Sequence, residues 1–392
     1  MTPSSQQHVV VMGAGAAGHS AVSTLRQEGY TGRLTVLHGE THRPYNRTLV
    51  NKGVLPGLLT AEQIALPALE LLDVDAVTAR VTALDADASQ LLLAGGERVG
   101  YTALIAATGS IPRPFPSAWD DSERLLGLHT VEDAAHIREL LSSDPAAARV
   151  TLLGAGFIGA ETASYVAGLG ATVHLVSRPV LPLAVVVGHT IARRVVEMHQ
   201  DHVTTHLGRE VAAIRSGSDS ITVTLDDDTR IESDLVVVAH GTAPASGWSS
   251  GQADVGVAVD DQLRAQRMRR VFAAGSVALH PATSGGRYRV DHWDAAAAQG
   301  AHAARTLLHD IAAAPDPGPY APTTGFTISL YRQPIAAYGV ALPDSEQREH
   351  IVDSGDGLLT TFHDPHSGEL TAAAGLNAGR ELLRLRDQLQ RP

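Results

Sequence analysis

Two glycine-rich turns constrain the fold of this chain more than any other feature. The first follows the apolar run at 9–12 and places Gly13, Gly15 and Gly18 before a helix-compatible segment from His19 to Glu28. Such glycines permit a sharp turn out of a strand, close approach of the backbone to a pyrophosphate, and packing of the helix on the sheet. The phosphates then meet free N–H groups at the positive end of the helix dipole. A turn of this kind can also be purely structural, but both flanks match the strand and the helix that dinucleotide binding requires.

A second copy of the motif indicates the architecture. Residues 149–153 repeat the strand, Gly154, Gly156 and Gly159 repeat the spacing, and the next predicted strand, 171–176, follows at the distance expected in a Rossmann unit. One chain is therefore predicted to hold two dinucleotide sites. Two such sites suggest a flavin and a nicotinamide that pass a hydride between them.

Length and charge exclude several classes of protein. At 392 residues the chain is long enough for two or three domains and a large core. Its 30 Lys and Arg against 42 Asp and Glu give a net charge of −12, which argues against nucleic-acid or membrane-surface binding. Residues 1–8 are polar, without an apolar signal core, and no later stretch is apolar enough to span a bilayer. We expect a cytoplasmic protein with no membrane segment and no metal site.

Two residue counts narrow the chemistry further. The chain has no cysteine, so it is not a reductase that relays electrons through a thiol pair. Of the 30 basic side chains only Lys52 is a lysine. A single lysine in an otherwise arginine-using chain suggests a specific role; the alternative is an accident of codon usage at the surface.

The residues before Lys52 carry a specific family resemblance. The strand 33–40 ends in Glu40, which could hydrogen-bond ribose hydroxyls. From Glu40 to Lys52 the chain resembles the E-x-x-x-P-Y-x-R-x-x-L-S-K run of the FAD-dependent ferredoxin reductases that serve oxygenases and cytochromes P450, with Asn51 in place of the serine. The resemblance implies that Arg47 contacts FAD and that Lys52 lies beside the isoalloxazine, paired with Glu161. A positive charge there would stabilise negative charge that develops on the flavin.

Later segments resemble the same family and imply the rest of a FAD site. Strands near 77–84 and 91–93 resemble its β-meander, in which Val81 is a candidate for backbone contact with adenine. The strand that begins at Tyr101 ends in the A-T-G turn, Ala107, Thr108 and Gly109, which returns the chain to FAD.

The most consequential departure from the family lies in its A-A-G-D-V run. Gly275 matches that run, but Ser276 stands where the family has the aspartate that binds the ribityl chain. Loss of the charge-assisted hydrogen bond predicts weaker or exchangeable flavin. Downstream, the segment from Asp291 resembles the R-x-E-x-W run, and Trp293 matches its tryptophan near the flavin ring.

The second glycine turn implies the NAD(P)H site. Phe157, Ile158 and Glu161 belong to its helix start, and Gly241 follows His240, a lone histidine that we do not regard as catalytic. NAD-specific relatives have an acid where this chain has Ser177, and that acid repels a 2′-phosphate. Ser177 and Arg178 could instead hold the phosphate, which favours NADPH. If Arg178 is only an exposed strand-end residue, both cofactors are used.

Together with the family resemblance, these observations predict an α/β chain with two Rossmann-like domains of the glutathione-reductase type and a small α+β C-terminal interface domain. A discontinuous FAD-binding domain covers 1–111 and 241–316, the NAD(P)-binding domain covers 112–240, and the interface domain covers 317–392. In the last domain we expect strands at 324–331, 335–340 and 357–363 and a helix at 378–389. Residues 324–329 lack the two tryptophans and the aspartate of the family's P-W-F-W-S-D motif.

The resemblance implies a FAD-dependent NAD(P)H oxidoreductase that passes electrons to a ferredoxin-type carrier, as a monomer or homodimer. Two alternatives stay open: direct reduction of a small molecule, a quinone or oxygen, and a non-catalytic nucleotide-binding protein. A cluster of Arg264, Arg267, Arg269 and Arg270 is either a docking patch for an acidic carrier or a solvated loop. The predicted catalytic residues are Lys52 and Glu161. The predicted FAD contacts are Gly13, Gly15, Ala16, Ala17, Gly18, Glu40, Arg47, Lys52, Val81, Ala107, Thr108, Gly109, Gly275, Ser276 and Trp293, and the predicted NAD(P) contacts are Gly154, Gly156, Phe157, Ile158, Gly159, Glu161, Ser177, Arg178 and Gly241.

Overall fold

The structure, a computed structural model, describes residues 7–141, 144–249, 255–282, 286–321, 325–341, 345–352 and 357–389. The chain forms two compact units. Unit 1 consists of Met1–Thr48, Ala61–Ile111 and Thr242–Pro322, and unit 2 of Leu49–Thr60, Pro112–Gly241 and Thr323–Pro392. Contacts thus group residues 49–60 and the C-terminal segment with unit 2, while the predicted domain boundaries stay predictions.

Unit 1 is built on a parallel sheet with the strand order β19-β7-β1-β2-β3. The strands are β1 (His8–Met12), β2 (Arg33–His38), β3 (Asp75–Thr78), β7 (Ala103–Ala106) and β19 (Val271–Ala273). The central strands β1 and β7 are apolar and almost fully buried, as expected for a parallel sheet covered on both faces.

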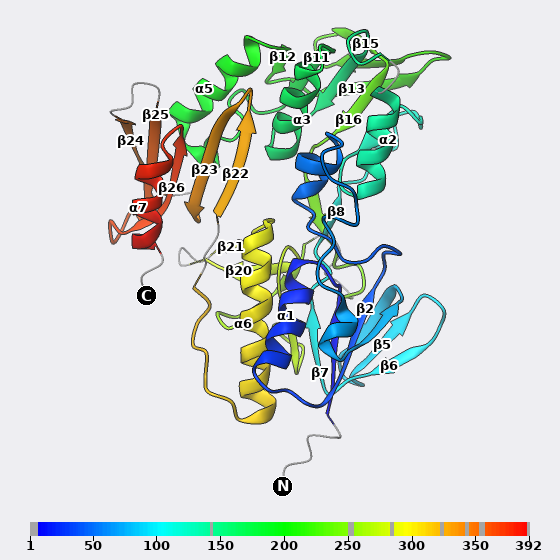
Figure 1. The fold of residues 1–392 in the computed structure, drawn as a ribbon, viewed down its shortest axis with the longest axis vertical. Coiled ribbons are helices and arrows are strands. Elements are labelled where there is room, and N and C mark those ends of the chain that lie inside the picture. The colour runs from blue at the N-terminus through cyan, green and yellow to red at the C-terminus, as the bar shows by residue number, and fades with distance from the viewer. Residues whose placement is uncertain are drawn as a thin grey trace. The chain divides into compact units, whose positions relative to one another are not determined.

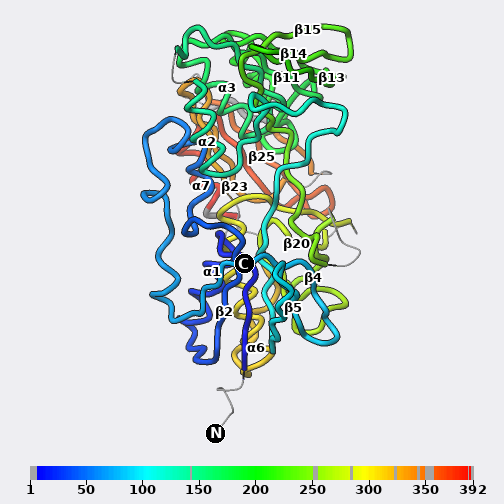
Figure 2. Tube along the Cα trace, turned by 90° about the vertical axis from the view of Figure 1, so that its right-hand side faces the viewer, coloured from blue at the N-terminus to red at the C-terminus, as the bar shows by residue number. Residues whose placement is uncertain are grey.

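Two helices of unit 1, α1 (Ala16–Gln27) and α6 (Trp293–Ala312), lie side by side (Figure 1; Figure 2). They approach so closely that a Cβ on Gly300 would lie 2.0 Å from the carbonyl oxygen of Ala17. Helix α1 begins at Ala16, three residues before the predicted start at His19, because Gly15 already serves as its N-cap.

The expected strand at 77–84 is wrong as a single element. Val77 belongs to β3, which extends the parallel sheet, and the chain then leaves that sheet after Ala79 donates its N–H to the carbonyl of His38. A separate antiparallel meander follows, made of β4 (Val81–Asp85), β5 (Gln90–Leu93) and β6 (Arg98–Gly100). Unit 1 also contains a 3-10 turn (Leu69–Leu72) and a small sheet of β18 (Val257–Ala258), β20 (Ala278–Pro281) and β21 (Arg287–Tyr288). Its strand β17 (Thr242–Pro244) pairs with β8 (Ser110–Pro112).

Unit 2 repeats the parallel arrangement with the strand order β12-β11-β10-β16-β9. These strands are β9 (Leu125–Gly127), β10 (Arg149–Leu153), β11 (Thr172–Ser177), β12 (Thr204–Leu207) and β16 (Leu235–Val238). The helices are α2 (Val131–Leu141), α3 (Phe157–Gly168), α4 (Ala184–Val187) and α5 (His189–Gln200), with a π-helical turn at Val50–Val54 and an antiparallel sheet of β13 (Val211–Ser216), β14 (Ile221–Leu225) and β15 (Arg230–Ser233). The two parallel sheets, in which a glycine turn leads from β1 into α1 and from β10 into α3, confirm the predicted pair of Rossmann-like folds.

The C-terminal segment of unit 2 forms an antiparallel sheet with the order β22-β23-β26-β25-β24, followed by α7 (Gly379–Leu389). The strands are β22 (Gly325–Leu330), β23 (Gln333–Gly339), β24 (Glu346–Val352), β25 (Gly357–His363) and β26 (Leu370–Leu376). Strands β24 and β26 were not expected from the sequence, the latter because its alanine-rich run has low intrinsic strand propensity. Thr324, expected in the first strand, lies outside the described residues. Among the helices of the described residues, none is long and apolar enough to cross a membrane.

Candidate functional site

The first glycine turn leaves room for a pyrophosphate at one position only. A Cβ on Gly13 would lie 2.2 Å from the carbonyl oxygen of Ala107, and a Cβ on Gly18 would lie 1.9 Å from that of Gly13. Both glycines are therefore required by packing, and Gly13 also has a φ of +97°. Gly15 is different: a Cβ added there would meet no described heavy atom within 4 Å, and the residue caps α1, whose first turn, including Ala16 and Ala17, carries no acid. An open glycine at a helix N-terminus fits an anionic diphosphate.

Other predicted FAD residues lie at the same carboxyl edge of the sheet in unit 1. Ala107 donates its N–H to Met12 at the end of β1, and the Thr108 hydroxyl donates to the carbonyl of Ala245 at 2.7 Å. Gly109 follows with a φ of +72°. Ligands of parallel α/β sheets bind outside the carboxyl ends of the strands, where these residues lie.

Beyond the end of β2, Glu40 and Arg47 form an ion pair. The Arg47 guanidinium also donates to the Tyr45 hydroxyl at 3.1 Å and lies 5.0 Å from the centre of its ring. The structure therefore brings two predicted FAD residues together and adds Tyr45, which the sequence had not singled out as a site residue. Val81 begins β4 nearby, two residues after the hydrogen bond of Ala79 to β2.

The end of β19 carries the residue that departs from the family. Gly275 has a φ of +79°, and a Cβ there would lie 3.0 Å from that of Ala17 in α1. The next residue, Ser276, is 8% exposed and donates its hydroxyl to Oδ1 of Asp291 at 2.5 Å. Trp293, two residues beyond Asp291, is the first residue of α6.

The second glycine turn, in unit 2, has the same geometry as the first. A Cβ on Gly154 would lie 2.3 Å from the carbonyl oxygen of Ala239, and a Cβ on Gly159 would lie 1.8 Å from that of Gly154. Gly156 caps α3 and has open space around it among the described residues. Of the two residues that follow, Phe157 packs on Phe326, whereas Ile158 is exposed. This turn also fits a diphosphate.

Glu161 is the centre of a polar group within unit 2. Its side chain is 11% exposed, and its Oε1 lies 3.8 Å from Nζ of Lys52. Asn51 donates to Oε2 at 2.8 Å, the backbone N–H of Ser329 donates to Oε1 at 3.1 Å, and Lys52 also donates to the carbonyl of Thr327. Burial raises the pKa of Glu161 above its ordinary value, against the opposing effects of Lys52, Ser329 and Asn51. The structure thus brings the two predicted catalytic residues together, and Asn51 joins them where the family has serine.

The predicted determinants of nucleotide choice lie at the end of β11. The Ser177 side chain is buried and donates to the carbonyl of Pro179 at 3.2 Å. Arg178 is 78% exposed, and its Nε lies 3.7 Å from Oε1 of Glu210. Gly241 has a φ of +94° after β16, and the adjacent His240 ring makes an edge-on contact with Phe115.

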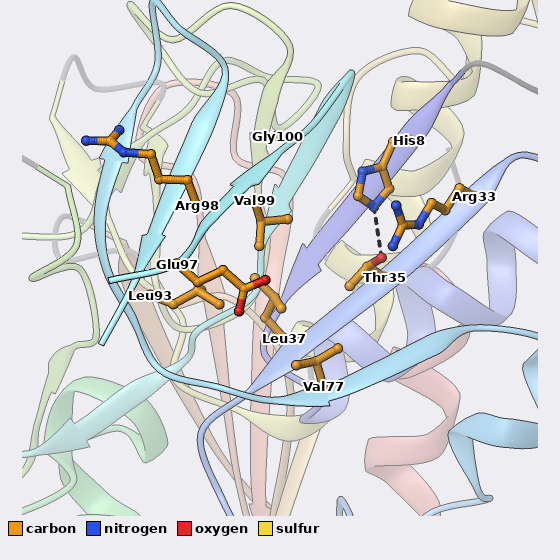
Figure 3. A pocket seen from close by; sticks show the side chains of 10 residues that line it. All are labelled: His8, Arg33, Thr35, Leu37, Val77, Leu93, Glu97, Arg98, Val99 and Gly100. Carbon is orange, nitrogen blue, oxygen red and sulfur yellow. Dashed lines mark hydrogen bonds between the residues drawn. The ribbon is translucent and has the colours of Figure 1, made fainter. Parts of the chain in front are cut away.

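Unit 1 contains a cavity of about 260 Å³ (Figure 3). Its lining runs along β2 from Arg33 to Leu37 and includes His8 of β1, Val77 of β3 and the hairpin around Glu97. The His8 ring and the Thr35 hydroxyl share a hydrogen bond of 2.8 Å, drawn as a dashed line in Figure 3. None of the predicted site residues is among its described lining.

Comparison with known proteins places the chain in a family. Residues 7–300 match the model of the pyridine nucleotide-disulphide oxidoreductases. Apoptosis-inducing factor 3 of Mus musculus is 28% identical over 389 residues, covering 95% of this chain and 61% of that protein. The Homo sapiens protein of that name is 28% identical over 78% of this chain and 51% of its own length. The chain therefore spans less than two thirds of those two relatives.

Two further comparisons cover nearly all of both chains. The biphenyl dioxygenase system ferredoxin–NAD(+) reductase component of Paraburkholderia xenovorans is 30% identical over 390 residues, 95% of this chain and 90% of that protein. The crystal structure of Fdr9 matches with a TM-score of 0.84 at 30% identity, over 97% of this chain and 94% of that one. These findings confirm the family resemblance inferred from the sequence. The chain belongs to the pyridine nucleotide-disulphide oxidoreductase family.

Proposed function

We propose that the chain is a FAD-dependent NAD(P)H oxidoreductase that passes electrons to a ferredoxin-type iron–sulfur carrier feeding a monooxygenase or cytochrome P450. The observation that carries this proposal is the presence of two open glycine turns of one geometry, at Gly15 and Gly156, in a chain without cysteine. The 30% identity to a dioxygenase-system ferredoxin–NAD(+) reductase component supports the choice of acceptor.

The two turns would hold the two cofactors by the same physics. The turn at Gly15 would bind the FAD diphosphate through backbone N–H groups and the α1 dipole, with Arg47 and Glu40 beyond β2. The turn at Gly156 would bind the NAD(P)H diphosphate in the same way through α3. The chemistry that bound FAD would supply is acceptance of a hydride from NAD(P)H and release of the electrons one at a time.

Lys52 and Glu161 are the residues that we assign to catalysis. Lys52 supplies a fixed positive charge where negative charge develops, and such preorganised charge lowers a barrier without reorganisation. Glu161 and the carbonyl of Thr327 hold its ammonium group. Because Asn51 and Ser329 also bond Glu161, the carboxylate is held in one orientation.

The preference for NADPH is a finer proposal that rests on Arg178. An exposed guanidinium at the end of β11 could pair with a 2′-phosphate, but Glu210 competes for it at 3.7 Å. Arg178→Gln should therefore lower the ratio of kcat/KM for NADPH over NADH, and Glu210→Gln should raise it. Equal ratios in both variants and the wild type would refute the assignment.

The arginine cluster does not support docking of the carrier near the flavin. Arg264 pairs with Asp310 at 2.7 Å, and Arg267 to Arg270 lie directly before β19. That is the amino end of the strand, opposite the carboxyl end where Ser276 lies. The solvated-loop alternative accounts for the cluster better.

The proposal is tested by steady-state assays with the FAD-loaded protein, NADPH or NADH, and a purified ferredoxin coupled to cytochrome c. Cytochrome c reduction that depends on added ferredoxin supports the proposal. NAD(P)H oxidation of the same rate without a carrier favours the alternative enzyme acting on oxygen, a quinone or a small molecule, which the altered 324–329 segment suggests. Protein that binds nucleotide without turnover would favour the non-catalytic alternative. The cytoplasmic location and the monomeric or dimeric state remain predictions.

A further inference from the structure

Asp291, which lies between β21 and α6, is a carboxylate that was not among the predicted site residues. Asp291 accepts hydrogen bonds from three hydroxyl groups: Ser276 at 2.5 Å, Ser110 at 3.1 and 3.2 Å, and Thr242. Arg289 completes the group, with its Nη1 at 3.3 Å from Oδ2 of Asp291. We refer to these five residues as the Asp291 group.

The Asp291 group lies where the first glycine turn would place a dinucleotide. Ser110 comes after the A-T-G turn that follows β7, and Ser276 comes after β19. Both strands run parallel to β1, so their carboxyl ends share one edge of the sheet with Gly13. The neighbouring Gly275 is within 3.0 Å of Ala17 in the α1 turn, measured from its ideal Cβ position. Ligands of parallel sheets bind at this edge.

The Asp291 side chain is fixed by these hydrogen bonds but remains partly exposed to solvent. It keeps 35% of its surface exposed despite its three hydroxyl donors and Arg289. Burial favours its neutral form, but hydrogen bonds from Ser276, Thr242 and Ser110 and the charge of Arg289 hold the pKa of Asp291 below its usual value. The Asp291 carboxylate is therefore ionised at neutral pH, and Arg289 balances its charge within the group.

The direction of the Ser276 hydrogen bond decides what that serine can do. A hydroxyl has one hydrogen to donate and two lone pairs to accept with. Because Ser276 gives its hydrogen to Asp291, its oxygen is left as an acceptor, and the carboxylate polarises it further. Ser276 can then accept a hydrogen bond from a ligand hydroxyl, as an aspartate at this position would, with the Asp291 carboxylate directly behind it.

We propose that Asp291, by accepting the hydrogen of the Ser276 hydroxyl, orients the Ser276 oxygen as the acceptor for a hydroxyl of the FAD ribityl chain, at the position where the family has an aspartate. This inference rests on the proposed function and makes Asp291 a positioning residue. It also revises the expectation of weak flavin binding, because an oriented acceptor remains at position 276.

The test measures the FAD dissociation constant of the apoprotein by fluorescence quenching. Asp291→Asn should raise it about tenfold, the value of one charge-assisted hydrogen bond. Ser276→Asp, which restores the family residue, should also raise the FAD dissociation constant, because its carboxylate would lie within hydrogen-bond distance of the Asp291 carboxylate and the two would repel each other. The double variant with Ser276→Asp and Asp291→Asn should recover to within about threefold of wild type, since one charge is present again. The matched control is Asp294→Asn in the exposed first turn of α6, which should stay within about twofold.

Thermal unfolding of each apoprotein accompanies the titrations, so that a folding defect is seen separately. Tighter FAD binding by Ser276→Asp alone would overturn the inference, as would an unchanged constant in Asp291→Asn. If Asp291→Asn does not fold, failure of the double variant to bind FAD better than Ser276→Asp overturns it. Wild-type protein that binds no FAD at all would overturn the proposed function itself.

Discussion

The second glycine turn allows packing and ligand binding to be separated by two alanine substitutions three residues apart. In Gly159→Ala the new methyl group would lie 1.8 Å from the carbonyl oxygen of Gly154 and 2.9 Å from its carbonyl carbon. In Gly156→Ala the methyl group meets no described atom within 4 Å, and the residue has a φ of −73°, which alanine adopts freely. We therefore expect opposite defects from the same chemical change.

The size of the Gly159 defect follows from the overlap. A carbon and an oxygen in van der Waals contact are well over 3 Å apart, so helix α3 must move by more than 1 Å or the turn must deform. Overpacking of this kind costs about 3 kcal/mol, which corresponds to a fall of roughly 6–12 °C in Tm for a unit of this size. Gly156→Ala should instead change Tm by less than about 2 °C, because it creates no clash.

The assay combines scanning calorimetry of the apoprotein with titration of NADPH or NADH into the FAD-loaded protein. Gly156→Ala should weaken nucleotide binding at least about tenfold while leaving Tm and FAD content unchanged, since its methyl group occupies the space for the diphosphate. A large fall in Tm for Gly156→Ala, or unchanged nucleotide affinity, would refute the assignment of that open space to the ligand. An unchanged Tm for Gly159→Ala would refute the packing argument.

Three further predictions concern charged groups in unit 2. Because burial raises the pKa of Glu161 above 4.5, its ionisation destabilises the folded state as pH rises. Glu161→Gln should therefore have a higher Tm than wild type at pH 8. A difference in Tm that does not shrink towards pH 4 would contradict this. Burial, with a smaller effect of His202, lowers the pKa of His199 from 6.5 to about 4. Protonation of this histidine should therefore remove about 3 kcal/mol of stability as pH drops from 6.5 to 4, so His199→Gln should lose less stability than wild type over this range in urea unfolding. Lys52→Met should slow flavin reduction in stopped-flow measurements and leave the FAD content intact, and unchanged kinetics would exclude its assigned role.

The backbone features of this chain were predictable from sequence because single residue types report them. A positive φ together with a lack of space for Cβ can be satisfied only by glycine, which is why Gly13 and Gly154 mark both turns. The buried strands before the two turns, β1 and β10, were predictable as short apolar runs. Strand β26 was not predictable from the sequence, because its alanines form a central strand only through pairing with β23 and β25.

The side-chain partners of the site residues were harder to predict. From the sequence alone, Ser276 indicates the loss of a charge. Only the fold brings Oδ1 of Asp291, fifteen positions away, to 2.5 Å from the Ser276 hydroxyl oxygen. Asn51 reads as a local change, yet it bonds Glu161 from 110 positions away. Such pairings depend on tertiary contacts that no spacing rule encodes, although the position of Asp291 in the R-x-E-x-W run was an available signal.

Anaerobic titration decides whether this one chain binds both a flavin and a nicotinamide and transfers hydride between them. The FAD-loaded protein is titrated with NADPH and, in parallel, with NADH while the flavin absorbance band is followed. We predict stoichiometric bleaching of the band, at lower concentrations of NADPH than of NADH. Protein that takes up no FAD, or a flavin band that neither nucleotide bleaches, would contradict the proposed hydride transfer.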